Sequence, residues 1–92
     1  MRAIGDGWSA LILRDLLFEE PRRFQDFQES LSGIVPSTLS GRLKRLEHDG
    51  LIARERYQSH PVREHYVLTP KGQSLGPVLA AMRRWGNENA PD

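Results

Sequence analysis

The sequence contains no cysteine among its 92 residues. Disulfide bonds, thiol redox switching and zinc sites with cysteine ligands are therefore excluded within it. Long apolar runs are also missing, since the longest, residues 78–82, is far too short to span a bilayer. No secretory signal is visible, because Gly5, Asp6 and Gly7 interrupt any apolar segment near the start. We therefore expect a cytoplasmic protein with no membrane partner.

Motifs that carry catalysis are missing as well. Residues 60–65 read H-P-V-R-E-H, which is one residue longer than the helical metal signature H-x-x-E-H and lies in a predicted hairpin. Glu47, His48 and Asp49 are consecutive on a predicted helix, so their side chains point in different directions. No phosphate-binding glycine loop or nucleophile elbow appears. We therefore expect no enzyme, no metal and no cofactor.

The formal net charge of +1 conceals an uneven distribution. Residues 37–63 carry six basic and three acidic side chains, a net charge of +3, so the remaining segments sum to −2. His48 and His60 lie in the same region and can add positive charge near phosphates. A positive charge concentrated in the middle of the chain is what a nucleic-acid-binding surface requires.

This basic region contains a predicted amphipathic helix over residues 36–49, with Gly50 placed to end it. Leu39, Leu43 and Leu46 recur on one helical face, which predicts that this face is buried. A glycine at position 41 destabilises a helix by about 1 kcal/mol relative to alanine. A close approach of the helix to the floor of a DNA groove would explain why glycine is present there. We interpret the segment as a DNA recognition helix; the alternative is a surface helix with a solvated basic face. The polar face comprises Ser37, Gly41, Lys44 and His48, with Thr38 and Arg45 at its flanks and Ser40 and Arg42 nearer its edges.

Two helices are predicted before this segment. The first covers residues 7–18, with Asp6 as its N-cap. The second is shorter, begins at Arg23 or the residue before it, and ends at residues 32–33, with Phe24 and Phe27 on its buried side. The second helix and the helix over residues 36–49 are thus joined by a tight turn that contains glycine, and the later of the two is basic on its outer face. This arrangement is typical of a helix-turn-helix.

Residues 51–68 alternate in the manner of β-strands and predict a hairpin. The strands at 51–57 and 63–68 are separated by a polar segment that we expect to form a loop longer than two residues. A helix-turn-helix followed by a hairpin with basic side chains at its tip is the winged-helix plan. We expect Arg63 and His60 to reach the DNA beside the recognition helix, and Arg54 and Arg56 to be weaker candidates that can lie on the far side.

The last predicted helix covers residues 70–86, with Thr69 as its N-cap and Pro70 in its first turn. Its apolar side exceeds what the core of so small a chain can absorb, so we expect dimerisation through it. An effector pocket would have to lie between the first and last helices, lined by Trp8, Ile12 and Met82, and the sequence gives a small-molecule effector little support.

Five segments of the sequence match the pattern of one family: G-D-G-W-S-A-L-I-L-R-D-L-L-F (5–18), R-R-F-Q-D-F (22–27), L-S-G-R-L-K-R-L-E-H-D-G-L-I (39–52), P-V-R-E-H-Y-V-L-T-P-K-G (61–72) and P-V-L-A-A-M-R-R-W-G (77–86). Taken together, they resemble the HxlR-type branch of the MarR-like winged-helix transcriptional regulators. The resemblance implies a homodimer that binds a roughly two-fold-symmetric operator and represses or activates neighbouring genes, with dimer contacts from the N-terminal segment and the last helix. Two departures matter. Members of the family commonly have a longer segment before the G-x-x-W motif, often with a cysteine that senses oxidants, whereas only residues 1–4 precede the motif here and no cysteine is present. We therefore expect no thiol sensing, and we expect part of the usual dimer contact to be missing or differently supplied. The charged residue usual at position 41 is absent, which we expect to alter sequence preference.

We therefore predict a mainly α fold with a small β-hairpin, a single winged helix-turn-helix DNA-binding domain over residues 1–92. The helix-turn-helix covers about residues 23–50, the wing 51–68 and a C-terminal dimerisation helix 70–86. The predicted function is a regulator that binds double-stranded DNA sequence-specifically as a homodimer on a pseudo-palindromic operator; the alternative is a winged helix that binds only proteins. The predicted DNA-binding residues are Pro36, Ser37, Thr38, Ser40, Gly41, Arg42, Lys44, Arg45, His60 and Arg63, and the predicted dimerisation residues are Trp8, Leu75, Val78, Leu79, Met82 and Trp85.

Overall fold

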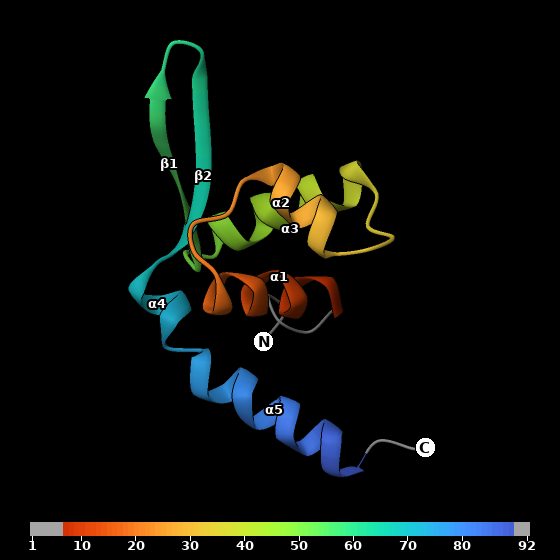
Figure 1. Cartoon of the computed structure of the whole chain (residues 1–92). Helices are drawn as coiled ribbons and strands as arrows, with labels where there is room; N and C mark the ends of the chain where they lie inside the picture. Colours follow the sequence, from red (N-terminus) through yellow and green to blue (C-terminus); the bar gives the residue numbers. More distant parts are fainter. Residues whose placement is uncertain (1–6, 90–92) are drawn as a thin grey trace.

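The computed structural model describes residues 7–89, which form a mainly helical fold with one antiparallel hairpin, as predicted. The helices that precede the hairpin gather at the centre, the hairpin projects from them on one side, and the last helix extends on the other (Figure 1). No helix in the described range is long and apolar enough to cross a membrane. The elements are α1 (Gly7–Phe18), α2 (Phe24–Ser30), α3 (Pro36–His48), β1 (Ile52–Ser59), β2 (Val62–Leu68), α4 (Pro70–Gln73) and α5 (Gly76–Asn89).

Helix α1 has the bounds that its apolar pattern predicts, and it is the helix around which the core forms. Ile12, Leu13 and Leu16 are fully buried and pack with the leucines of α3 and the base of the hairpin. Asp15 is also buried, and its carboxylate accepts a hydrogen bond of 2.5 Å from the hydroxyl of Ser30 on α2. A buried carboxylate needs such partners, so this contact fixes α2 against α1. The predicted N-cap of α1, Asp6, lies outside the described residues.

Helix α2 begins at Phe24, two residues later than the earliest predicted start, and its first turn is closed by a capping box. The carboxylate of Asp26 accepts a hydrogen bond from the backbone N–H of Arg23 at 2.8 Å and forms an ion pair with the Arg23 guanidinium at 3.0 Å. These contacts hold the pKa of Asp26 below its ordinary value. The helix ends at Ser30, and the turn that follows contains Gly33 with φ of +89°, a conformation that favours glycine.

The hairpin is longer at its tip than the sequence predicts. Main-chain pairing continues to Ser59 and Val62, so the loop is the two-residue segment His60–Pro61 rather than a longer loop. A register shift between Arg56 and Gln58 lets the polar residues near the tip stay paired. Backbone hydrogen bonds need no apolar side chain, and for this reason the polar composition of residues 58–62 suggested a wrong loop length.

The single C-terminal helix predicted over residues 70–86 is two helices, α4 and α5. Proline has no N–H, and inside a helix its ring clashes with the carbonyl four residues before it, so Pro77 prevents α4 from continuing. Thr69 is the N-cap of α4 as predicted, with its hydroxyl accepting from the backbone N–H of Gly72 at 3.1 Å. A Cβ on Gly72 would lie 2.1 Å from the carbonyl oxygen of Leu51, so this corner between the wing and α4 requires glycine.

Candidate nucleic-acid interface

Helix α3 is oriented as the leucine spacing predicts. Leu39, Leu43 and Leu46 are buried in the core against α1. The opposite face is exposed and contains no acidic side chain, because Glu47 and Asp49 lie at its edge and its end. Arg45 is exposed and lies 3.6 Å from Asp49, which partly offsets its charge. The predicted contact residues Ser37, Gly41 and Lys44 are exposed together with His48, while Thr38, Ser40 and Arg42 are partly buried at the edges of this face.

The beginning of α3 has no side-chain cap and no acidic residue in its first turn. Val35 is the N-cap and Pro36 is the first helical residue; both are exposed. The positive end of the helix dipole therefore faces solvent without a neutralising carboxylate, beside the hydroxyls of Ser37 and Thr38. This end of α3 suits a negatively charged ligand better than a neutral one.

Gly41 is not required by the protein's own packing. A Cβ built at this position meets no heavy atom within 4 Å, and the backbone is ordinary helix. Alanine would stabilise the isolated helix by about 1 kcal/mol relative to glycine. The fold itself offers no reason for glycine on this exposed face.

The wing presents two different faces, because residues directly opposite each other in an antiparallel pair share a face. Arg54 pairs with Tyr66 and Arg56 with Glu64, on the same face as buried Ile52. The Nε atom of Arg54 lies 3.1 Å from a carboxylate oxygen of Glu47 on α3. This face therefore turns toward α3, and the expectation that Arg54 can lie on the far side is wrong. Because side chains alternate between the two faces of a strand, the spacing of two residues between Ile52 and Arg54 was enough to predict that they share a face.

Arg63 lies on the other face of the wing. It alternates with Glu64 and therefore shares its face with His65, whose ring stacks on Tyr57 with centroids 4.9 Å apart. The Nε2 atom of His65 lies 3.1 Å from a carboxylate oxygen of Glu55 on the paired strand. His60 occupies the tip itself and is exposed. The structure thus places Arg63 and His60 toward the end of the wing, and only Arg54 beside α3.

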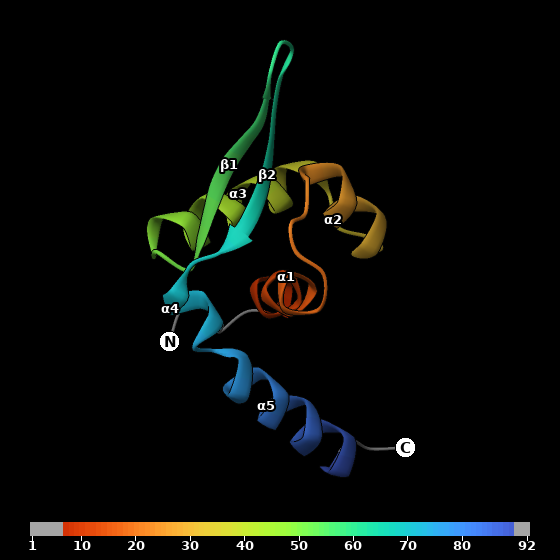
Figure 2. The same ribbon diagram turned by 60° about the vertical axis from the view of Figure 1, so that its left-hand side comes forward.

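The base of the wing is held by a contact that the sequence did not reveal. Arg22, in the segment between α1 and α2, exchanges two backbone hydrogen bonds with Tyr66 of β2, at 3.0 and 2.6 Å. The Tyr66 ring packs edge-on against Phe27 of α2, with centroids 6.1 Å apart, and its burial raises the pKa of its hydroxyl. Both α2 and the segment before it therefore hold the base of the wing, and this segment runs beside the hairpin in the two views of Figures 1 and 2.

Comparison with known proteins agrees with this arrangement. The model of the HxlR-like helix-turn-helix family matches residues 3–92. The chain belongs to this family. An HTH-type transcriptional regulator of Halalkalibacterium halodurans is 37% identical over 86 residues, which are 94% of this chain and 76% of that protein.

Solved structures of similar regulators cover nearly the whole chain. The redox regulator HypR in its oxidized form has a TM-score of 0.88 and 30% identity, covering 99% of this chain and 93% of that one. A regulator of the MarR family from Enterococcus faecalis has a TM-score of 0.83 and 31% identity, covering 97% and 80%. This HxlR-like chain is therefore a transcriptional regulator with a helix-turn-helix DNA-binding fold.

The predicted dimerisation residues of this HxlR-like protein divide into two groups. Leu75 is buried, and Leu79 and Trp8 are partly buried against the chain's own core. Val78, Met82 and Trp85 follow one another at helical spacing on α5 and are exposed, Trp85 to 68%. Leu75, Leu79 and Trp8 thus pack in the chain's own core, and Val78, Met82 and Trp85 form the exposed apolar face of α5.

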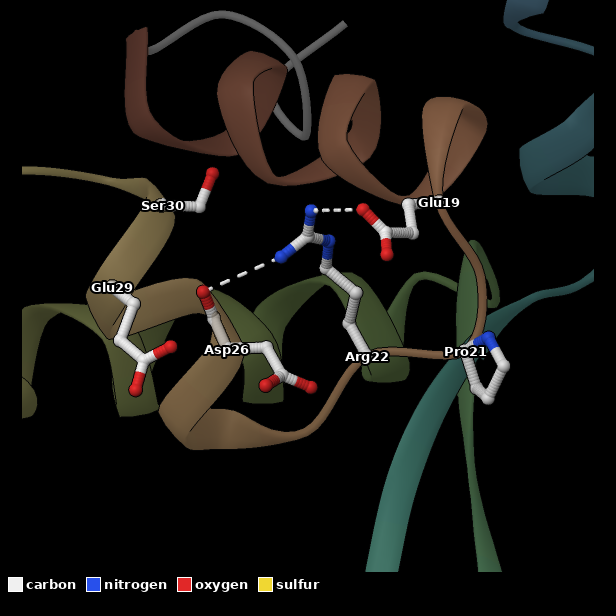
Figure 3. Close-up of a pocket in the computed structure, with 6 residues that line it drawn as sticks. All are labelled: Glu19, Pro21, Arg22, Asp26, Glu29 and Ser30. Atoms are coloured by element: carbon white, nitrogen blue, oxygen red, sulfur yellow. Dashed lines mark hydrogen bonds and ion pairs between the residues drawn. The ribbon is translucent and has the colours of Figure 1, made fainter.

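A pocket lies between the end of α1 and α2, away from the predicted effector site. It has a volume of about 360 Å³ and is open and polar. The Arg22 guanidinium crosses it, with one nitrogen 3.2 Å from the Glu19 carboxylate and another 3.4 Å from the Asp26 carbonyl oxygen (Figure 3). Ile12, expected to line an effector pocket, is instead fully buried in the core. Within residues 7–89 no group of three or more His, Cys, Asp or Glu side chains could hold a metal ion.

Proposed function

We propose that the protein is a homodimer that binds a pseudo-palindromic operator in double-stranded DNA and regulates transcription there. The observation that carries this proposal is the exposed face of α3, which is polar and basic and lies opposite three buried leucines. The buried face fixes the orientation of the helix, so the exposed face is presented as a rigid surface. In a helix-turn-helix such a surface enters the major groove.

The roles that we assign follow from position on α3 and the wing. Side chains near the start of the helix contact base edges and nearby phosphates, while later basic side chains contact phosphates or guanine edges. The wing adds contacts to the flanking backbone. Arg54 already pairs with Glu47, so we keep Arg63 and His60 as the wing contacts. The proposed DNA-binding residues are Pro36, Ser37, Thr38, Ser40, Gly41, Arg42, Lys44, Arg45, His60 and Arg63.

The exposed apolar face of α5 supports the proposed dimer. Val78, Met82 and Trp85 form a stripe that a second copy of α5 would cover in a two-fold arrangement. Two recognition helices related by such an axis read half-sites about ten base pairs apart, and the operator is then pseudo-palindromic. Because its ligand is chromosomal DNA, the protein acts in the cytoplasm.

Selection of bound duplexes from a random pool, followed by footprinting, tests the DNA part of the proposal. The expected result is one inverted repeat whose half-sites are centred about one helical turn apart. A selected site without two-fold symmetry contradicts the dimer arrangement. Failure to select any sequence supports the alternative, a winged helix that binds only other proteins.

The dimer is tested by sedimentation of a Met82→Glu variant. Charge in the middle of the exposed stripe should convert dimer to monomer and weaken operator binding, because the two half-sites are then bound independently. Gln73→Glu, at an exposed position on α4, introduces the same charge and should leave the dimer intact. A Met82→Glu protein that remains dimeric excludes this face as the interface.

A further inference from the structure

Val35 is an exposed valine at the point where the chain enters α3. Its side chain is 54% exposed, whereas the neighbouring Ile34 is buried. Val35 is the N-cap of the helix, with φ of −82° and ψ of 149°, and it makes no side-chain capping hydrogen bond. Ser, Thr, Asp and Asn are preferred at this position because their oxygen accepts from a first-turn N–H, and valine is among the least favourable residues. The fold therefore gains only partial burial and no cap from valine here.

The backbone around Val35 is held on both sides, so its methyl groups point in a fixed direction. The Val35 carbonyl accepts a hydrogen bond from the N–H of Leu39 at 3.0 Å, and the N–H of Ile34 donates to the Leu31 carbonyl at 3.1 Å. A β-branched side chain is itself stiff about χ1. Pro36, which follows, is exposed as well. Val35 and Pro36 are thus two consecutive exposed apolar residues, on a hydrogen-bonded backbone, at the beginning of the exposed α3 face.

The major groove contains one apolar feature that two such residues can recognise. Thymine displays its C5-methyl group there, beside the hydrogen-bonding atoms of the bases. Residues at the beginning of a recognition helix are those that reach the base edges. We infer that Val35, together with Pro36, is a specificity-determining site that contacts the C5-methyl group of one thymine in each half-site. The inference rests on the proposed placement of α3 in the major groove, and it names the base that this end of the helix selects.

Replacing each thymine of the selected operator in turn with deoxyuridine tests the contact, because this removes the methyl group and keeps every hydrogen-bonding atom. Replacement of one particular thymine in each half-site should weaken binding of the protein to the operator about fourfold. This ratio corresponds to about 0.8 kcal/mol, the transfer free energy of one methylene-sized group. In a Val35→Ala protein the same replacement should have a smaller effect, because the two γ-methyl groups that valine presents to the thymine are missing. An operator in which no thymine methyl matters, or full discrimination retained by Val35→Ala, overturns the inference.

Val35→Ser separates recognition from stability. Serine supplies the missing cap and should raise the unfolding midpoint by about 4–8 °C, while it lowers the preference for thymine over deoxyuridine as alanine does. A serine variant that keeps the full preference contradicts the inference.

Lys44→Ala shows which of the two proposals has failed. If α3 does not face DNA, Lys44→Ala also leaves binding unchanged and the proposed function fails. If Lys44→Ala weakens binding while the Val35 variants and deoxyuridine have no effect, only the thymine contact is refuted.

Discussion

Gly41 lies in the middle of α3, on the face that we place against DNA, and a Cβ at this position meets no heavy atom within 4 Å. Replacing Gly41 with alanine should therefore stabilise the protein, by about 1 kcal/mol from helix propensity alone. A chain of 92 residues has a total stability of about 5–14 kcal/mol, so this gain should raise the unfolding midpoint by about 4–8 °C.

The same substitution should weaken the DNA complex. If the backbone at Gly41 approaches the groove closely, the added methyl group overpacks the interface at a cost of about 1–3 kcal/mol, or about 5- to 150-fold in affinity for each recognition helix. Thermal unfolding and operator titration of one preparation measure both effects.

Gly76→Ala is the matched control for Gly41→Ala. Its Cβ would meet Leu17 at an ordinary 3.5 Å, and it lies at the start of α5, away from the proposed DNA surface. It should leave operator affinity unchanged. A stabilised Gly41→Ala protein with unchanged affinity would refute the close approach, and a destabilised one would refute the orientation of α3.

Three further substitutions test the fold beneath the site. Leu43→Asp places a carboxylate in the core and should unfold the protein in circular dichroism; a folded variant that still binds DNA would overturn the orientation of α3. Gly72→Ala forces a Cβ against the Leu51 carbonyl and should lower the free energy of unfolding in urea by about 1–3 kcal/mol, so an unchanged value would contradict the packing of α4. Asp26→Asn should cost about 1 kcal/mol at pH 7 through its contacts to Arg23. The folded pKa of Asp26 lies below its ordinary 3.8, so the stability difference between the protein and Asp26→Asn should be fully present above pH 3.8 and should disappear as the pH falls through the folded pKa. A stability difference that does not change with pH would exclude the carboxylate as its source.

The sequence predicts best where structure depends on local periodicity. The bounds of α1 and the buried face of α3 follow from apolar residues three and four positions apart, because a helix places those side chains on one face. The cap at Thr69 was predictable for the same reason, since capping involves residues within one turn. The candidate DNA surface is the complement of the buried leucines, and its residues could therefore be named from the sequence.

Features that depend on backbone pairing between distant residues were not predicted. The bridge between Arg22 and Tyr66 joins main-chain atoms and leaves no side-chain pattern, and the same holds for the pairing of Ser59 with Val62 that shortens the loop. Pro77 was a sequence signal for the break between α4 and α5. The helical spacing of apolar residues continues across the break, however, and therefore predicted one helix.

The measurement that tests the central claim most directly is a titration of the protein and of Lys44→Ala against the selected operator and a scrambled duplex at two salt concentrations. The account predicts sequence-selective binding that weakens steeply as salt rises. It also predicts that Lys44→Ala binds both duplexes more weakly, with a salt slope smaller by about 1 for each phosphate that the lysine neutralises. Absence of binding to either duplex at low salt would contradict it and leave the exposed face of α3 as a surface for protein partners.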